Sequence, residues 1–336
     1  MLNLGIIGTN WITAQFVNAG AENSVFTLTA VYSRTAEKAQ KFAESVARPE
    51  AKLFTDLEEF FASDAFDVVY IASPNSLHKE QAVQAINAGK HVIVEKPAVS
   101  NPSEFKEVKA ALAENDEVFF FEAARHIFDP NFKVLENKLA ELQETGRVNG
   151  ATISYMKYSS RYDKVLAGEE PNIFSPKFSG GALQDLGVYV VYGALRLFGT
   201  PEKVHYFADM TSTGVDAKGT AILDYPNFHV TLLFGKTAQS YVPTEIYAGK
   251  QTLWVDSIAT LDEVKFYPDY SSSDFEDLTV AHPENPMVDE ADFFAKAIET
   301  GDFDAMQELL VLSHNVNEVL FALRKNAGIE FAADRG

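Results

Sequence analysis

Cysteine is absent from the 336 residues of the sequence. This absence excludes disulfide bonds, thiolate metal sites and a cysteine nucleophile, and it fits a reducing cytoplasm. No apolar run approaches the ~20 residues that a membrane-spanning helix requires. The opening residues, MLNLG, include no basic segment ahead of an apolar one, so we expect no signal peptide. We therefore expect a cytoplasmic protein without a membrane partner.

Positive charge is also scarce, because 28 Lys and Arg stand against 48 Asp and Glu and the formal net charge is -20. Nucleic acids and anionic membranes carry the same sign of charge as such a protein, so we expect no nucleic-acid partner. The 7 histidines are scattered, and none lies at a metal-binding spacing from an acidic residue. The sequence therefore predicts no metal site.

Strand-like and helical segments alternate over the first 122 residues. Short apolar or β-branched runs are each followed by a segment with helical spacing. This alternation implies right-handed crossovers and a parallel, doubly wound sheet of the Rossmann type, which places the fold in the α/β class. We expect strands at 2–8, 26–33, 51–54, 66–73, 91–95 and 117–123, and helices at 10–20, where the spacing stops at a glycine, 35–47, 56–63, 75–90 and 101–115.

The pattern changes after about residue 145, where hairpins are indicated by the turns at 225–227 and 248–250. We therefore expect a nucleotide-binding domain at 1–122 and an α+β domain at 123–336, built on a large, open, mainly antiparallel sheet, with C-terminal helices that can pack back on the first domain. An open sheet with one apolar face is often covered by a second subunit, so we expect a homodimer through this sheet. Helices are expected at 182–198, 287–300 and 304–326.

The segment GIIGTNWI follows the first expected strand and opens the first expected helix. A dinucleotide-binding turn of this kind directs backbone N–H groups and a helix N-terminus at a pyrophosphate. The three glycine positions of its fingerprint hold Gly8, Asn10 and Thr13, and Asn10 tolerates a left-handed backbone. An ordinary strand-to-helix turn is the alternative, but its place on the first strand of a doubly wound sheet favours the cofactor. The candidate residues are Gly8, Thr9, Asn10, Trp11 and Ile12.

The second strand ends in VYSRTAEK, without the acidic residue that NAD-preferring sites usually place there for the ribose 2′-hydroxyl. Ser33, Arg34 and Lys38 stand there instead. A guanidinium can donate two parallel hydrogen bonds to a 2′-phosphate, whereas a solvated arginine at the start of a helix is the alternative. We therefore expect NADP as the cofactor, in preference to NAD.

Two further strands end at the same edge of the sheet as Gly8, one in SPNSLH and the other in EKP. Lys96 would be costly at the end of a buried strand unless its ammonium points into a polar cleft, and Pro97 disfavours helical backbone there. Asn75 is expected to cap the next helix. His78 either reaches the cofactor or lies on the surface, and we favour the surface. The cofactor candidates at this edge are Ser73, Pro74, Asn75, His78, Glu95 and Lys96.

Three segments, GIIGTN, SPNSLHKEQAVQAINAGKHVIVEKP and GGALQDLGVYVV, resemble the glucose–fructose oxidoreductase and inositol dehydrogenase family of NAD(P)-dependent oxidoreductases. The resemblance covers nearly the whole chain; AGKHVIVEKP is a specific signature, whereas the glycine-containing turn is not. The tyrosine of the third segment is most similar to the branch that contains dimeric dihydrodiol dehydrogenase. The resemblance implies a nucleotide-binding domain, a C-terminal sheet domain and an active site between them, with Lys96 beside the nicotinamide and the substrate hydroxyl.

Asp185 and Tyr189 lie four residues apart in the third segment and would share one face of a helix. From the residues alone, Asp185 could serve the early turn of that helix and Tyr189 could be a core residue. The resemblance instead implies that both belong to the active site. Our hypothesis is that Tyr189 exchanges the proton, Lys96 lowers its pKa and polarises the substrate oxygen, and Asp185 orients a substrate hydroxyl or the ammonium. Lys96 as the proton donor is an equal alternative.

Three further residues are candidates for contact with the substrate. Relatives often carry an arginine before the aromatic residue in the segment after the sixth strand, where FEAARHIFDP has Ile127. Arg125 and His126 precede it and are candidates for substrate contact, although Arg125 could instead balance Glu122. Tyr158 could line the cleft or be an ordinary aromatic residue of an exposed strand.

The sequence therefore predicts an NAD(P)-dependent dehydrogenase or reductase that acts on the CH–OH group of a sugar, polyol or small hydroxy-carbonyl compound. The first alternative is a regulator that binds nicotinamide nucleotide without turnover, although such a sensor would need only the first domain. The second is a redox-neutral enzyme that cleaves glycosides with bound NAD.

Overall fold

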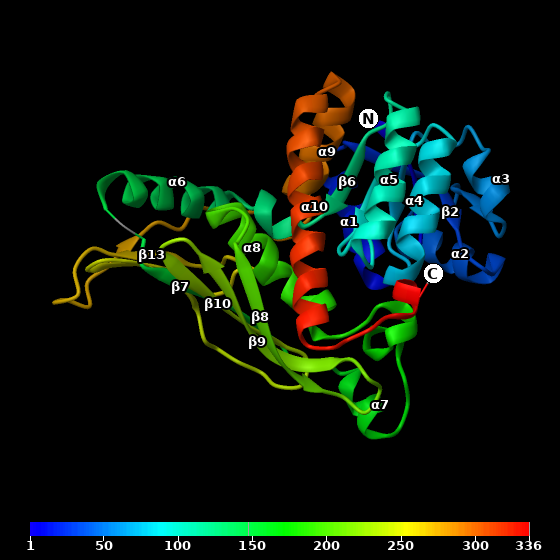
Figure 1. Ribbon diagram of the computed structural model, residues 1–336. Helices are drawn as coiled ribbons and strands as arrows, with labels where there is room; N and C mark the ends of the chain where they lie inside the picture. Colours follow the sequence, from blue (N-terminus) through cyan, green and yellow to red (C-terminus); the bar gives the residue numbers. More distant parts are fainter. Residues whose placement is uncertain (147, 336) are drawn as a thin grey trace. The chain divides into compact units, whose positions relative to one another are not determined.

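The computed structural model describes residues 1–146 and 148–335, which form two compact units. The first unit comprises Met1–Arg125 and Pro283–His314, and the second comprises His126–His282 and Asn315–Gly336. Each unit carries one β-sheet (Figure 1). Among the described helices, none combines the length and the apolar character that crossing a membrane requires.

The sheet of the first unit has six parallel strands in the order β3-β2-β1-β4-β5-β6. This is the doubly wound Rossmann order, so the predicted fold class is confirmed. The strands are β1 (Leu2–Ile7), β2 (Phe26–Tyr32), β3 (Lys52–Phe54), β4 (Val68–Ile71), β5 (His91–Glu95) and β6 (Phe120–Ala123). The helices are α1 (Trp11–Glu22), α2 (Ala36–Ser45), α3 (Leu57–Phe61), α4 (His78–Asn87), α5 (Pro102–Glu114), α9 (Val288–Thr300) and the first part of α10 (Phe303–Asn326).

Both faces of this sheet are covered. On one face, Val69 and Val92 belong to an apolar cluster that includes Ala82 of α4 and Phe105 of α5. On the other face, the ring of Phe16 in α1 stacks on Tyr70 of β4 at 4.0 Å, and Phe294 of α9 stacks on Phe121 of β6 at 4.7 Å. Helix α9, from far later in the sequence, therefore completes the first unit (Figure 1).

Helix α1 continues through Gly20 to Glu22, so the prediction that it stops at this glycine is wrong. Gly20 is buried, and a Cβ there would lie 2.8 Å from the Cβ of Phe26 in β2. The glycine is needed for the close approach of helix and strand rather than for ending the helix.

The second unit is built on eight strands in the order β14-β13-β12-β11-β7-β10-β9-β8. All pairs are antiparallel except the central pair of β7 and β10, so the sheet is mainly antiparallel, as predicted. Both expected hairpins are present. The strands are β7 (Gly150–Met156), β8 (Lys203–Met210), β9 (Asp216–Tyr225), β10 (Phe228–Gly235), β11 (Thr244–Ala248), β12 (Gln251–Val255), β13 (Val264–Tyr267) and β14 (Glu276–Asp277).

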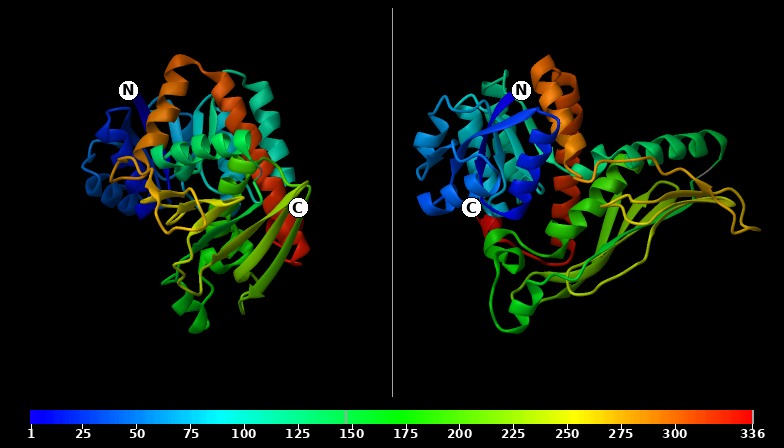
Figure 2. Two further views of the ribbon diagram at one scale, coloured as in Figure 1. Left: turned by 90° about the vertical axis from the view of Figure 1, so that its left-hand side faces the viewer. Right: turned by 180° about the vertical axis from the view of Figure 1, so that it is seen from behind.

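Helices α6 (Pro130–Thr145) and α8 (Val188–Phe198) pack on one face of this sheet (Figure 2). Helix α6 was not predicted, although Asp129 caps it through the N–H of Asn131 at 2.8 Å and Pro130 holds its first position. On the covered face, Leu232 of β10 is completely buried; on the opposite face, Phe207 of β8 is 68% exposed. The shorter helical segments are α7 (Tyr162–Leu166), η2 (Arg125–Phe128), η3 (Asn172–Phe174), η4 (Pro176–Phe178), η5 (Leu183–Gly187) and η6 (Ala332–Arg335).

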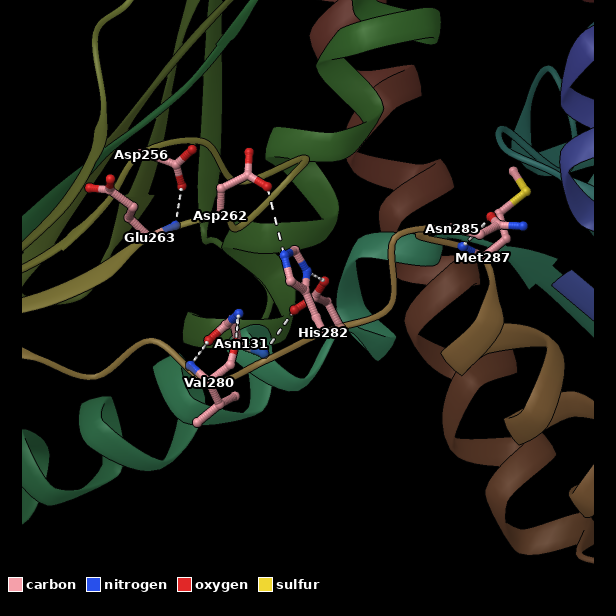
Figure 3. Close-up of polar contacts among 9 residues, drawn as sticks. Asn131, Asp256, Asp262, Glu263, Val280, His282, Asn285 and Met287 are labelled. Carbon is pink, nitrogen blue, oxygen red and sulfur yellow. Dashed lines mark hydrogen bonds and ion pairs between the residues drawn. The ribbon is translucent and has the colours of Figure 1, made fainter. Parts of the chain in front are cut away.

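The segment that follows β14 makes two sets of contacts within the second unit, at Val280 and His282, before the chain enters the first unit again (Figure 3). Asn131, in the first turn of α6, exchanges two hydrogen bonds with the backbone of Val280, at 2.9 and 2.7 Å. The Nδ1 of His282 lies 2.8 Å from a carboxylate oxygen of Asp129, and its Nε2 lies 3.7 Å from Asp262. The return segment is thus held as far as His282, the residue at which this part of the second unit ends.

Candidate functional site

The turn after β1 is built closely around Gly8. Its φ is +103°, and an added Cβ would lie 2.5 Å from the carbonyl oxygen of Ala72, just beyond β4. Asn10 caps α1 by accepting from the N–H groups of Ile12 and Thr13, and its amide donates to Ala72 at 3.0 Å. The φ of Asn10 is -105°, so this residue adopts extended backbone and does not use the left-handed conformation that asparagine tolerates. The turn offers the bare backbone and the helix N-terminus that suit a pyrophosphate.

Trp11, the first residue of α1, is 75% exposed, whereas its neighbours Thr9 and Ile12 are half-buried. The chain has 2 tryptophans, and the other, Trp254, lies in the second unit. The emission of Trp11 is therefore a local reporter for ligands that bind this turn.

The end of β2 presents two exposed cations. Ser33 is almost buried, and its N–H donates to Phe54 of β3 at 3.0 Å. Arg34 and Lys38 are exposed, and neither forms an ion pair within residues 1–146 and 148–335. Their charges stay available to an anionic ligand at this end of the strand.

His78 is buried, with 1% of its surface exposed, so the surface position favoured from the sequence is wrong. Its Nδ1 lies 3.0 Å from the carbonyl oxygen of Pro97, and its Nε2 lies 2.8 Å from that of Ser73. Burial lowers the pKa of His78, and the Lys96 ammonium lowers it further, against the effect of the two carbonyl groups. The imidazole ties the segment after β4 to the residue that follows Lys96.

The connection between β4 and α4 also differs from the prediction. A 3₁₀ turn, η1 (Asn75–Leu77), precedes α4; Pro74 occupies the N-cap position of the turn and Leu77 that of the helix. The prediction that Asn75 caps the helix is therefore wrong. The Ser73 hydroxyl donates to Gln81 of α4 at 2.7 Å, which holds this loop against the helix.

Glu95 and Lys96 end β5 in different surroundings. Glu95 is 8% exposed and accepts a hydrogen bond from the Tyr70 hydroxyl at 2.5 Å. Burial raises the pKa of Glu95, and the Lys96 ammonium opposes that shift. Lys96 is half-buried, and its peptide bond to Pro97 is cis. Both neighbours of Lys96 are held by hydrogen bonds, the Glu95 side chain by Tyr70 and the Pro97 carbonyl by His78.

Arg125 stands near two buried carboxyl groups of the first unit. Glu290 of α9 is completely buried, and burial together with the charge of Glu95 raises its pKa well above the usual value. The positive charge of Arg125 opposes both shifts, because it lowers the pKa of Glu95 and of Glu290. Glu122, the residue that Arg125 could alternatively balance, accepts a hydrogen bond from the N–H of Ala98 at 3.1 Å.

In the second unit, the predicted helix at 182–198 begins as a π-helical turn, η5, and continues as α8. Gly181 precedes it with φ +123°, and a Cβ there would lie 2.2 Å from the carboxylate of Asp216. That carboxylate accepts from the N–H of Leu183 and from the Tyr206 hydroxyl, both at 2.6 Å. Asp216 thus holds the start of the π turn, and π turns of this kind often occur at functional sites.

Asp185 lies within the π turn, and 33% of its side chain is exposed. Its Oδ2 accepts a hydrogen bond at 2.5 Å from Lys236, whose side chain is almost wholly buried. Lys236 was not among the predicted site residues. It follows β10 directly, where a lysine looks like any polar residue that ends a strand.

Tyr189 begins the regular part of α8 and is 8% exposed. Its ring lies between the rings of Tyr155, at 5.3 Å, and His126, at 4.9 Å. The Nε2 of His126 also lies 3.1 Å from the backbone oxygen of Tyr189, and the imidazole is 2% exposed. His126, a candidate for substrate contact, therefore packs around the tyrosine.

Tyr158, the third substrate candidate, lies in the loop after β7 and is 41% exposed. Its hydroxyl donates to Asp163 at 2.6 Å, which raises the pKa of the phenol. Across residues 1–146 and 148–335, no group of three or more His, Asp or Glu side chains is arranged to hold a metal ion.

The first unit therefore contains the phosphate-binding turn, the Arg34 region and Lys96, and the second contains Asp185, Lys236 and Tyr189. Within the first unit, the geometry offers a nucleotide-binding edge and an ammonium on a fixed backbone. Within the second, it offers a partly exposed carboxylate and a phenol four residues apart. Such groups can bind a hydroxyl-bearing substrate and exchange a proton with its oxygen.

Comparison with protein families gives two matches. The family described as "Oxidoreductase family, NAD-binding Rossmann fold" matches residues 2–123. The family described as "GFO/IDH/MocA C-terminal domain" matches residues 137–254.

Whole-chain relatives extend this similarity. The chain is 41% identical over 335 residues to a scyllo-inositol 2-dehydrogenase (NADP(+)) of Bacillus subtilis, with 100% of both chains covered. It is 26% identical over 346 residues to a trans-1,2-dihydrobenzene-1,2-diol dehydrogenase of Mus musculus, with 99% of both covered. Among solved structures, a 3-ketoreductase from Actinomadura kijaniata in complex with NADP matches with a TM-score of 0.81 at 21% identity, over 97% of both chains, and it shares the fold.

Proposed function

This chain belongs to the GFO/IDH/MocA family of oxidoreductases, and from that premise we propose that it is an NADP-dependent dehydrogenase of a cyclic polyol or a sugar. The observation that carries the proposal is the similarity, at 41% identity and over the whole chain, to an NADP-dependent dehydrogenase of scyllo-inositol. The conversion is the oxidation of a secondary alcohol to a ketone, or its reverse. The absence of cysteine supports the cytoplasmic location that we also propose.

The first unit has the residues to hold NADP. Gly8 leaves a bare backbone at the start of α1, where the dinucleotide phosphates would bind. The exposed guanidinium of Arg34, with Ser33 and Lys38, suits the 2′-phosphate. Bound nicotinamide would supply the hydride acceptor or donor for the substrate carbon.

We assign the remaining chemistry to three side chains. Lys96 polarises the substrate oxygen with its ammonium, since both of its neighbours, the Glu95 side chain and the Pro97 carbonyl, are held by hydrogen bonds. Tyr189 exchanges the proton of that oxygen, and Asp185 accepts a hydrogen bond from a substrate hydroxyl. Lys96 as the proton donor is the competing assignment.

The proposal is tested by incubating the purified protein with cyclic polyols, sugars and small hydroxy-ketones, together with NADP or NAD. Nicotinamide absorbance reports hydride transfer, and chromatography of the products reports any conversion without it. Reduction of NADP by a polyol supports the proposal. Cofactor binding without turnover of any compound would indicate a sensor, and glycoside cleavage without a net absorbance change would indicate the redox-neutral alternative.

The Arg34→Glu variant is expected to prefer NAD. Loss of the charged contact to the 2′-phosphate should raise the KM for NADP by about 10- to 100-fold, because hydrogen bonds to charged groups contribute about that much. The KM for NAD should change little or fall. Lys41→Glu, on the helix α2 that follows Arg34, is the control, since it makes the same charge change at an exposed lysine already paired with Glu37. Equal effects on both cofactors would contradict the role of Arg34.

We also propose a homodimer that covers the open face of the second unit's sheet, where no described helix packs (Figure 2). On that face Phe207 is aligned across the strands with Thr220 and Leu233, and it is 68% exposed. The unmodified protein should show twice the mass of one chain in light scattering. Phe207→Asp should shift it toward the monomer, whereas Tyr241→Asp, at a loop position 92% exposed, should not. A monomeric unmodified protein would rule the dimer out.

A further inference from the structure

Lys236 carries an ammonium group inside the second unit. Only 1% of its side chain is exposed, and its Nζ lies 2.5 Å from Asp185 Oδ2 and 3.3 Å from the carbonyl oxygen of Ile173. The same Nζ lies 4.6 Å from the ring centroid of Phe174, a completely buried residue. A buried charge is costly unless it is paired and hydrogen-bonded, so Asp185 is the partner that makes this position tolerable for a lysine.

The backbone of Lys236 is held on both sides. Its N–H donates to Ala217 at 2.9 Å, and its carbonyl accepts from Ser159 at 2.8 Å. The Ile173 carbonyl that meets its ammonium also accepts from Gly181, at 3.0 Å, next to the π turn that carries Asp185. Lysine and aspartate are therefore fixed in one framework, with little freedom to separate.

The two members of the pair differ in exposure. Lys236 is enclosed, whereas a third of the Asp185 side chain is exposed. The ammonium thus contacts the carboxylate from the interior and leaves part of it accessible. An ionised carboxylate only accepts hydrogen bonds, and a neighbouring ammonium favours the ionised form.

We propose that Lys236 is a positioning residue for the reaction, which holds Asp185 ionised and oriented so that its accessible side accepts a hydrogen bond from a substrate hydroxyl. This inference rests on the proposed function and deepens it. The substrates it favours carry a hydroxyl group besides the one that is oxidised, as vicinal diols and polyols do.

The test compares Lys236→Met, Lys236→Arg and Asp185→Asn with the double variant Lys236→Met/Asp185→Asn. Lys236→Met should lower kcat/KM for a polyol by about 10- to 100-fold, and the acid limb of its pH profile should move to higher pH, because Asp185 then protonates more easily. Lys236→Arg should recover part of the activity. In the Asp185→Asn background, Lys236→Met should cause little further loss and no shift of the acid limb.

A second carboxylate requires a control, because the charge of the Lys236 ammonium also favours the ionised form of the buried Asp216 carboxyl group. A shift of the acid limb that persists in the Asp185→Asn background would assign the effect to Asp216 and overturn the proposal. Equal losses in both backgrounds, or a lower melting temperature with an unchanged pH profile, would do so too. If the unmodified protein oxidised neither a polyol nor a sugar with NADP, the proposed function would fail instead.

Discussion

Replacing Lys96 with Met is expected to lower kcat by about 10³-fold or more, since one preorganised electrostatic contact to a reacting oxygen contributes on this scale. Methionine keeps much of the side-chain volume but has no charge and no ionisable proton. The contacts of its two neighbours, from Tyr70 to the Glu95 carboxylate and from His78 to the Pro97 carbonyl, involve none of the Lys96 side chain. The fold and the binding of NADP should therefore change little.

Binding in the Lys96→Met variant can be followed by quenching of Trp11 emission on addition of NADPH, in a Trp254→Phe background. The matched control is Lys79→Met, which removes a lysine of α4 that pairs with Glu107 on the surface. Turnover close to that of the unmodified protein would exclude Lys96 from the chemistry. Loss of NADPH binding together with turnover would assign it to the cofactor alone.

Replacing Tyr189 with Phe decides which group exchanges the proton. General acid–base catalysis by a side chain contributes about 10²- to 10⁴-fold, so the variant should lose that much kcat if the phenol is the donor. The ring lies between Tyr155 and His126, and phenylalanine retains that packing. A large loss with an unchanged melting temperature therefore reports chemistry rather than folding.

Tyr192→Phe is the control for Tyr189→Phe, because Tyr192 lies one turn further along α8 and is 2% exposed. It should keep full activity. Near-normal turnover of the Tyr189→Phe variant would leave Lys96 as the proton donor. The pH profile would then lack any contribution from the phenol.

The sheet of the first unit could be predicted because each strand–helix–strand step is local in sequence. Every expected strand of the N-terminal half is present in the parallel sheet. Errors arose where the role of a residue depends on a contact with another segment in the folded structure. Gly20 looked like a helix stop but accommodates Phe26, and His78 looked like a surface residue but joins Ser73 to Pro97.

The candidate site could be predicted only in part from the sequence. Lys96 could be singled out because its neighbours along the chain, a buried strand and a proline, are themselves informative. Lys236 could not, since its partner Asp185 is 51 residues away and no periodicity links the two. The π turn has no sequence period of its own, so a single regular helix was the natural expectation for 182–198.

The chain passes between the two units three times, at residues 125–126, 282–283 and 314–315. During synthesis on the ribosome, the first 125 residues emerge with every strand of their sheet but without α9, so Phe121 has no Phe294 to cover it. Helix α1 already packs on this face, but the part that α9 covers stays exposed until the whole second sheet has been translated. Such a protein should depend on chaperones during translation more than one whose N-terminal domain is contiguous.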